Sequence, residues 1–426
     1  MSPSRTPVTL LALPVYIPSL IWASGYGALS SVMVLAALSL GYTQAWASAI
    51  AGISGLVGVV TGPRVGHWIT RVGDRTAFLT GSGLAIGSLV GTLVALREPG
   101  RMWAMVVYML GILALSVSSN IWSLARQSYV AESVPERWRA RGMSMLGGML
   151  RLGQLIGPAI GSLAIAAWGM TGSFVLQAVT VVIALGFILG FTLPSPEVLA
   201  DPGARHADPR VPDTPPPSSI PRRPRRLRAD RTATALLGAG IVVLGLVRAN
   251  RMVVIPLLGT ALGIPDHAIT ATFAASAVLD ALMFYPGGRI ADRFGRRAAL
   301  LPTLAVMGAG FFLMAAWTSP LGFVASACLI GFGNGFGSGI MMTMGADLSP
   351  DVDRSDFLGL WQSISLIGST AGPFLVSALV TAFGVGSSAW VTGALSVLGA
   401  VWFALVVPPA YRRLGVDDRG LPLHRP

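Results

Sequence analysis

The chain has 426 residues, of which 53% are hydrophobic and 11% are charged. A soluble chain carries about 25% charged residues, so this one has too little polar surface to be an ordinary cytoplasmic or secreted enzyme. The net charge of +12 comes from 30 basic residues, every one of them Arg, against 18 acidic ones. The single cysteine, Cys328, excludes a disulfide framework and a cysteine metal site within one chain.

Twelve long apolar runs follow one another along the chain, each near the ~20 residues that a helix needs to cross ~30 Å of hydrocarbon. A membrane barrel would instead show alternating segments of ~10 residues. The first run has no convincing cleavage site and eleven more follow it, which favours a retained helix over a removed signal. The sequence therefore predicts an all-α membrane protein with twelve transmembrane helices. The runs cover residues 10–36, 45–65, 76–96, 102–124, 142–167, 172–192, 233–258, 268–287, 299–318, 320–345, 358–382 and 388–409.

The placement of arginine indicates the orientation of these helices. The candidate outer loops hold Arg97 and Arg101, whereas the inner loops, tails and linker hold twenty-four arginines. Cytoplasmic excess of arginine is the positive-inside signal, so we expect a protein of the cell (inner) membrane with both termini cytoplasmic. Attraction to acidic membrane lipid is a secondary reason for the basic excess, and nucleic-acid binding a remote third.

A segment between the sixth and seventh runs divides the chain. Residues 193–231 contain ten prolines and eight arginines. Such a composition cannot bury enough apolar area to fold alone, so we expect a disordered cytoplasmic linker between an N-terminal bundle, 1–192, and a C-terminal bundle, 232–426. A regulatory or partner-binding role for this linker is the alternative.

The two halves repeat each other in sequence. Duplicated six-helix halves are how several transporters build a central site between two rocking bundles. The matching segments are 66–75 with 288–297 at an offset of 222, and 131–136 with 346–351 and 157–158 with 372–373 at an offset of 215.

Two of these segments resemble motifs of the major facilitator superfamily. Residues 288–297 fit its signature Gly-x-x-x-Asp-Arg-x-Gly-Arg-Arg at every defined position. Residues 153–162 read Gly-x-x-x-Gly-Pro-x-x-Gly-Ser and resemble the antiporter motif of the drug/proton antiporter branch, where the family usually has Gly in place of Ser162. The resemblance covers all twelve runs and implies two pseudo-symmetric six-helix bundles around a central cavity.

The repeated loop motif predicts a gate at the inner face. Glycine removes side-chain bulk where helix ends approach, and ion pairs among the charged residues make a latch that holds one conformation. The alternative is that the arginines only enforce topology. The first copy has Thr70 where Asp is expected and Asp74 where a base is expected, which puts its latch in doubt. The candidate gate residues are Gly66, Arg71, Gly73, Arg75, Gly288, Asp292, Arg293, Gly295, Arg296 and Arg297, with Glu132 and Asp347 as acidic partners.

The antiporter-like motif places three glycines on one helix face. Gly153, Gly157 and Gly161 recur every four residues, and Pro158 removes one backbone hydrogen bond and bends the helix. Such a small-residue face either seals or pivots the interface between the halves, or serves ordinary tight packing.

Charges inside the apolar runs are costly and therefore mark candidate functional residues. Four lie away from the run ends: Arg151, Arg248, Arg251 and Asp280. Asp280 lies about 12 Å and Arg151 about 14 Å from the inner ends of their helices, whereas Arg248 lies about 22 Å away. Because the resemblance makes the fifth and eighth helices face each other, we expect an Asp280–Arg151 pair between the halves that couples transport to protons. A fixed structural ion pair is the alternative.

Arg248 and Arg251 share one helix face, three residues apart. With Arg151 they give three buried positive charges against one negative, which favours a substrate that carries an anionic group. Arg251 alone is also explained by snorkelling toward the outer surface. Helix-to-helix hydrogen bonding or packing is the alternative role for the remaining cavity candidates. These are Tyr26, Asn120, Gln154 and Asn334.

The leading functional prediction is proton-coupled export of small amphiphilic compounds by alternating access. The chain has no Lys and hence no nucleotide-binding loop, so energy must come from a gradient. We expect substrate, protons and membrane lipid as partners, no cofactor or metal, and a monomer, since both halves of the site lie in one chain. An importer or facilitator is the nearest alternative. A receptor or membrane enzyme is disfavoured because the outer loops are short and the runs hold no His, Cys or paired-carboxylate cluster.

Overall fold

The computed structural model describes residues 10–134, 136–191, 230–350 and 354–420. All of its elements are helices. Among these residues, eleven helices are long and apolar enough to cross a membrane, and a bent pair at the start of the chain makes a twelfth. The predicted all-α fold with twelve spans is therefore confirmed.

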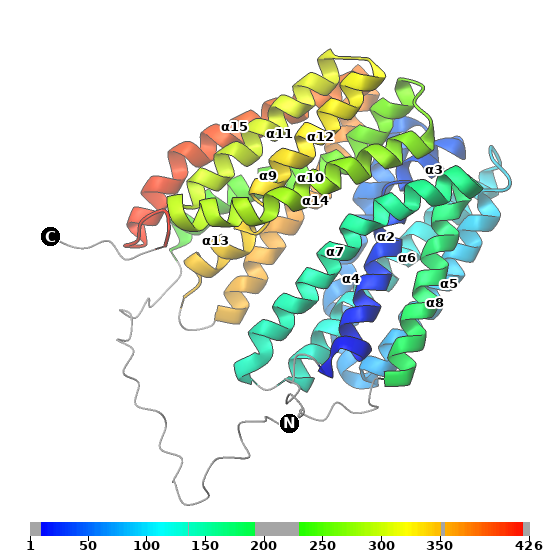
Figure 1. Ribbon diagram of the computed structural model, residues 1–426, viewed down its shortest axis with the longest axis horizontal. Helices are drawn as coiled ribbons and strands as arrows, with labels where there is room; N and C mark the ends of the chain where they lie inside the picture. Colours follow the sequence, from blue (N-terminus) through cyan, green and yellow to red (C-terminus); the bar gives the residue numbers. More distant parts are fainter. Residues whose placement is uncertain (1–9, 135, 192–229, 351–353, 421–426) are drawn as a thin grey trace, which may run out of the picture.

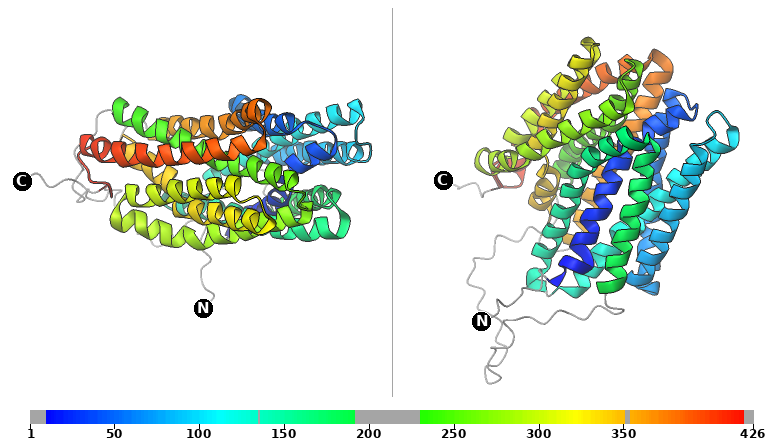
Figure 2. Two further views of the ribbon diagram at one scale, coloured as in Figure 1. Left: turned by 90° about the horizontal axis from the view of Figure 1, so that it is seen from above. Right: turned by 45° about the vertical axis from the view of Figure 1, so that its right-hand side comes forward.

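The helices form two halves of six spans each (Figures 1 and 2). The N-terminal half comprises η1 (Ala12–Tyr16), α2 (Ile17–Ser30), α3 (Met33–Ser39), α4 (Gln44–Val72), α5 (Asp74–Ala95), α6 (Met102–Ser133), α7 (Glu136–Trp168) and α8 (Thr171–Phe191). The C-terminal half comprises α9 (Arg231–Ala261), α10 (Asp266–Phe294), α11 (Arg296–Ala316), α12 (Pro320–Phe336), α13 (Ile340–Leu348), α14 (Arg354–Phe383) and α15 (Val385–Arg413).

We call the two ends of the molecule the linker end and the far end. The linker end holds the end of α8 and the start of α9, and the far end holds the turns after α3, α5, α7, α9, α11 and α14. Asp230 caps α9 by accepting from the backbone amides of Thr232 and Ala233, both at 2.9 Å. The last residues of the predicted linker therefore belong to this helix, and residues 192–229 lie outside the described residues.

The first span is broken between α2 and α3, where two serines bond to backbone carbonyls of the preceding turn. Ser30 and Ser31 donate to the carbonyls of Gly27 and Ala28, at 3.0 and 2.8 Å. Such back-bonding competes with regular helix geometry, and α2 and α3 meet at an angle of 41°. The tenth span is likewise interrupted, between α12 and α13.

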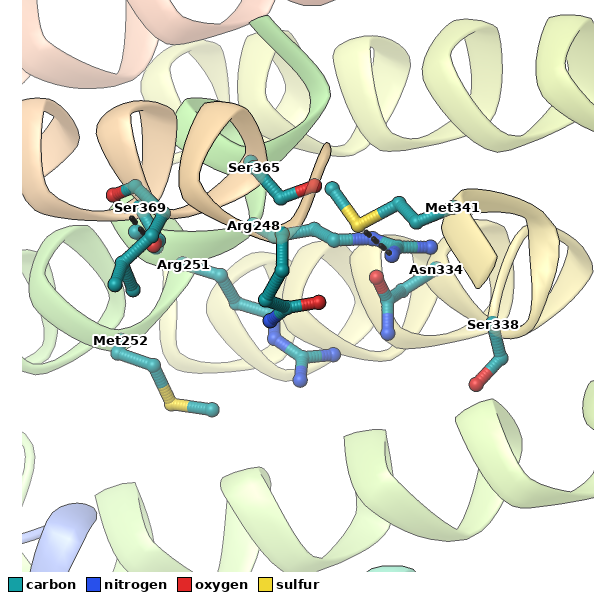
Figure 3. A pocket seen from close by; sticks show the side chains of 12 residues that line it. Arg248, Arg251, Met252, Asn334, Ser338, Met341, Ser365 and Ser369 are labelled. Carbon is teal, nitrogen blue, oxygen red and sulfur yellow. Dashed lines mark hydrogen bonds between the residues drawn. The ribbon is translucent and has the colours of Figure 1, made fainter. Parts of the chain in front are cut away.

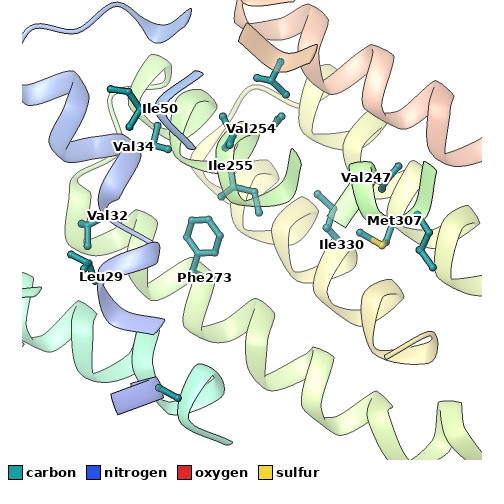
Figure 4. Packing of buried hydrophobic residues seen from close by; sticks show 14 of the residues in the cluster. Leu29, Val32, Val34, Ile50, Val247, Val254, Ile255, Phe273, Met307 and Ile330 are labelled. Carbon is teal, nitrogen blue, oxygen red and sulfur yellow. The ribbon is translucent and has the colours of Figure 1, made fainter. Parts of the chain in front are cut away.

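Apolar side chains join the two halves near the break in the first span. Figure 4 shows Leu29 and Val32 of the first span lying toward Phe273 of α10, with Ile255 of α9 beside them. These four side chains are all buried. The far ends of the halves thus share one packed core.

The halves meet at the far end and separate toward the linker end. On α4, a Cβ at Gly52 would lie 2.9 Å from Phe374 of α14, and one at Gly55 would lie 3.2 Å from Thr370. Closer to the linker end, a Cβ at Gly62 would meet no atom of the described chain within 4 Å. Helices α7 and α10 diverge in the same direction (Figure 1). The molecule is closed at the far end.

Candidate functional site

Asp280 forms an ion pair within the C-terminal half. Its Oδ2 atom accepts from Arg251 Nη1 at 3.2 Å and from Asn334 Nδ2 at 2.6 Å. The Arg251 and Asp280 side chains are only 13% and 19% exposed. The explanation of Arg251 by snorkelling is therefore wrong, since its guanidinium is engaged inside the bundle.

Arg151 has a different role from the one expected. Its Nη2 donates to the backbone carbonyl of Ser338 at 3.0 Å, and its guanidinium lies 4.9 Å from the ring centre of Phe284. The expected pair with Asp280 is thus replaced by contacts to the break after α12 and to α10. Arg151 still joins the halves, because it belongs to α7 and both partners belong to the C-terminal half.

Close packing of α12 on α10 positions Asn334. A Cβ at Gly331 would overlap the backbone of Ser276, and one at Gly335 would overlap that of Asp280. With no side chains between them, the two backbones approach closely, and Asn334 reaches the Asp280 carboxylate. The glycines around Asn334 therefore serve packing, and this packing builds the site.

A cavity of about 350 Å³ adjoins this ion pair. That volume lies within the range of small-molecule sites, about 300–1,000 Å³. Figure 3 shows Arg248 and Arg251 of α9 between Asn334 and Met341 on one side and serines of α14 on the other. Every lining residue belongs to the C-terminal half: Gly245, Arg248, Ala249, Arg251, Met252, Asn334, Ser338, Met341, Gln362, Ser365, Leu366 and Ser369.

Arg248 presents donors that nothing in the described chain accepts. Its Nη1 lies 3.7 Å from the sulfur of Met341, whereas buried Nε and Nη2 have no partner among these residues. Nε of Arg251 is likewise buried and has no partner among the described residues. Buried N–H groups without an acceptor are costly, and a ligand or water at the site supplies one. The cavity wall thus carries hydrogen-bond donors that the described chain leaves unused.

The candidates from the N-terminal half do not line this cavity. Asn120 donates to Gly58 and Thr61 of α4, at 2.7 and 3.0 Å, so it joins two helices of its own half. Tyr26 stacks on Trp22, with ring centres 5.1 Å apart. Gln154 is exposed on α7.

Arg126 is a buried charge that the sequence analysis missed. It is 4% exposed, its guanidinium lies 4.9 Å from the Trp22 ring centre, and its Nε and Nη1 have no partner within the described ranges. The apolar run ends at residue 124, whereas α6 continues to Ser133. The spacing from Trp122 would have revealed Arg126, because residues four apart in a helix lie on the same face, here a buried one.

Comparison with known proteins identifies the family. The family model of the Major Facilitator Superfamily matches residues 123–248 and 237–423, well over half of the chain. The protein belongs to the Major Facilitator Superfamily. A search of the curated proteins found no match.

Solved structures of transporters share the fold. A POT family transporter in complex with a thioalcohol-conjugated peptide superposes with a TM-score of 0.69 at 13% identity, over 94% of this chain and 96% of that one. A D-xylose–proton symporter gives 0.67 at 15%, over 98% and 100%. The xylose transporter XylE from E. coli, inward open, gives 0.62 at 17%, over 94% and 96%. The protein is an integral membrane transporter rather than an enzyme.

The superfamily signature forms an ion-pair cluster in the C-terminal half. Arg296 donates from Nε to Asp347 Oδ2 at 2.9 Å and from Nη1 to Asp292 Oδ1 at 3.3 Å. Tyr411 of α15 donates to the same Asp347 oxygen at 3.0 Å. The segment after α15 joins the cluster, because the Arg296 amide donates to the carbonyl of Asp418 at 2.7 Å.

The first copy of the signature lacks an equivalent cluster among its described side chains. Asp74 stands at the position of Arg296 in the repeat and is 8% exposed. Glu132, at the position of Asp347, accepts instead from Ser128 on its own helix at 3.1 Å. Two acids at the positions of a base and an acid cannot form an ion pair with each other.

The glycines of the signature differ in their roles. Gly73 and Gly295 have φ angles of +81° and +96°, which favour glycine where one helix turns into the next. A Cβ at Gly66 or Gly288 would meet no atom of the described chain within 4 Å, so the expected close approach is absent in this conformation. The remaining signature arginines lie near the surface: Arg71, Arg293 and Arg297 are exposed and Arg75 is half-buried.

The antiporter-like glycines pack two helices of the same half. A Cβ at Gly153 would lie 2.6 Å from that of Ala23, and one at Gly161 would lie 2.8 Å from that of Ala28. Gly157, between them, faces Gly27. All three contacts join α7 to α2, so this face does not form the interface between the halves. Pro158 lies inside the unbroken helix α7.

Proposed function

We propose that the protein is a proton-coupled transporter of small amphiphilic compounds that carry an anionic group. The observation that supports this most is the Asp280–Arg251 pair beside a cavity with unmet arginine donors. Intramembrane carboxylates paired with arginine are candidates for proton relays, because a proton removes one of the two charges. One chain carries the whole site, so a monomer is sufficient.

The geometry favours binding of the proton and the anion together. A proton on Asp280 removes its negative charge and releases Arg251 from the ion pair. The substrate anion then takes the place of the carboxylate, held by Arg251 and by the free N–H groups of Arg248. Without the proton, Asp280 competes for the same guanidinium. Cooperative binding of this kind favours symport.

Export is the second candidate, supported by the antiporter-like sequence at residues 153–162. In that case the substrate and the proton cross in opposite directions. The arginine excess supports a cytoplasmic linker end in a protein of the cell (inner) membrane. The far-closed conformation then exposes the site to the cytoplasm, where an exported substrate binds and an imported one is released.

Reconstituted vesicles with an imposed pH gradient test the coupling. With a panel of radiolabelled carboxylates, we expect the intact protein to accumulate at least one compound. Asp280→Asn cannot exchange a proton, so it loses gradient-driven accumulation but retains substrate counterflow. Asp266→Asn, on the same helix, keeps both. Accumulation by Asp280→Asn that still follows the pH gradient would contradict the proposal, and the sign of the gradient separates symport from antiport.

Arg248 tests the anionic substrate class. Charge-assisted hydrogen bonds contribute about 1.5–3 kcal/mol, so Arg248→Gln should weaken binding of the transported anion by about 10- to 100-fold. The exposed Arg289 of α10 provides a control for the lost charge, and Arg289→Gln should leave affinity unchanged. Equal affinity of the intact protein and Arg248→Gln for the anion would exclude this binding mode.

A further inference from the structure

Two serine hydroxyls connect the halves at the far end. Ser162 of α7 donates to the backbone carbonyl of His267 in α10, at 3.0 Å. Ser377 of α14 donates to the backbone carbonyl of Ala45 in α4, at 2.8 Å. Each bond runs from one half of the molecule to the other, and in opposite senses.

The two bonds are equivalent under the internal repeat. Ser162 and Ser377 are 215 residues apart, the offset that also relates residues 157–158 to 372–373. Ala45 and His267 are 222 residues apart, the offset that relates the two loop signatures. Ala45 and His267 are each the second residue of their helices. The same contact is thus made twice, once from each half.

These serines forgo the usual acceptor of a helical serine. Serine hydroxyls within helices commonly bond the carbonyl three or four residues earlier. Ser363 and Ser369 of α14 do this, donating to Gly359 and Leu366 at 3.0 Å each. Ser377, on the same helix, reaches across to α4 instead. Its acceptor is available because a carbonyl has two lone pairs and the helix uses only one.

We propose that Ser162 and Ser377 are a pair of gate residues that hold the far end closed. Each bond requires contact between a helix of one half and the first turn of a helix of the other. Both must break before the far end opens, and neither contacts the cavity. The hydroxyl of Ser162 supplies a donor that a glycine at this position would lack.

The equivalence of the two bonds predicts how the loss of either one changes the equilibrium between the far-closed and far-open states. Two equivalent bonds contribute equally, so losing either one should shift the equilibrium toward the far-open state by the same factor. A net hydrogen bond changes an equilibrium constant about fivefold. Because the two serines lie in separate contacts, losing both should give about the product, roughly 25-fold.

Distance measurements between spin labels on the two halves test this. In a Cys328→Ser background, labels at Arg97→Cys and Thr318→Cys mark far-end turns of the N- and C-terminal halves. In lipid nanodiscs without substrate, Ser162→Ala and Ser377→Ala should each increase the far-open population about fivefold. Ser363→Ala, which loses only a bond within its helix, should not change it. The readout needs no transport, so failure of the proposed function leaves it interpretable.

Threonine variants separate the hydroxyl from general packing. Ser162→Thr and Ser377→Thr retain the donor and should restore the far-closed population of the parent. If both alanine variants give the same distance distributions as Ser363→Ala, the gate proposal is overturned. It is equally overturned if the threonine variants open the far end as much as the alanine variants do.

Discussion

Asp280 has two partners of different kinds, and this difference determines what a proton changes. The bond from Asn334 is to a neutral amide and remains possible when the carboxyl is protonated, whereas the attraction to Arg251 depends on charge. In the proposed coupling, a proton on Asp280 thus releases Arg251 selectively while Asn334 still orients Asp280. Arg248, one helical turn away on α9, has donors with no partner among the described residues.

A double-mutant cycle tests the partner assignment. Arg251→Gln leaves Asp280 with only Asn334, and the loss should be largely cancelled in the double variant with Asp280→Asn. Contacting charges couple by about 0.5–3 kcal/mol, so we expect about 1–3 kcal/mol for this pair. The same cycle with Arg151→Gln should give a smaller value, because Arg151 bonds to Ser338.

Thermal unfolding of the four variants of each cycle in detergent measures the coupling. Additive shifts for Arg251 and Asp280, together with strong coupling for Arg151 and Asp280, would restore the partner expected from sequence. The sequence-based expectation compared the depths of Asp280 and Arg151 along straight, independent helices. It could not foresee that Gly335 brings α12 against Asp280, or that α9 places Arg251 within reach.

At the scale of elements, the contact of α7 with α2 differs in character from its contact with the C-terminal half. Toward α2 it presents Gly153, Gly157 and Gly161, with backbone against backbone. Toward the C-terminal half it presents Ser162 and Arg151, which make one hydrogen bond each. The first contact fixes α7 within its half, and the second includes polar bonds that can be exchanged for water. A rigid half that moves against its partner requires this combination.

Alanine substitutions on α7 distinguish its packed face from its open one. A Cβ at Gly157 would lie 2.8 Å from backbone atoms of Gly27 and Ala28, which cannot yield without moving α2. Overpacking costs about 1–3 kcal/mol, so Gly157→Ala should lower the unfolding temperature in detergent. Gly148→Ala is the matched control, because a Cβ there meets no described atom within 4 Å. Equal unfolding temperatures for the two variants would contradict the packing role.

The loop signature shows how far an element can be predicted from its motif. The sequence predicted a partnership of Asp347 with the signature arginines, and Arg296 makes that contact. The role of the segment after α15, which places Asp418 against Gly295, had no sequence signal because its contacts are made by backbone atoms. The acids at positions 74 and 132 explain why the two halves differ here despite their common repeat.

For the whole molecule, hydropathy and the internal repeat predicted the architecture, because the hydrocarbon thickness fixes span length and duplication fixes the relation of the halves. The conformational state could not be predicted, since one sequence must support both states. The extent of the helices was also underestimated: α6 passes its apolar run by nine residues, up to Ser133. An arginine just after an apolar run is interpreted as part of a loop, because the sequence does not show which neighbours bury it.

The orientation of the whole molecule provides the last prediction. The linker end carries most of the arginines, and removing the eight in residues 193–231 still leaves sixteen there against two at the far end. Replacing those eight by glutamine should therefore keep both termini cytoplasmic, because the excess in the short loops persists. Reporters fused after residue 426, one active in the cytoplasm and one outside it, measure this.

Reversal of topology in the glutamine variant would show that the linker charges alone set the orientation. The far-closed state would then expose Arg248 to the outside in that variant. Retained topology supports cytoplasmic access instead, since the arginines at the linker-end helix termini, such as Arg71 and Arg293, suffice to hold that end inside. In a far-closed molecule of that orientation, a membrane-impermeant carboxylate should bind in the Arg248 cavity only when it is added on the cytoplasmic side.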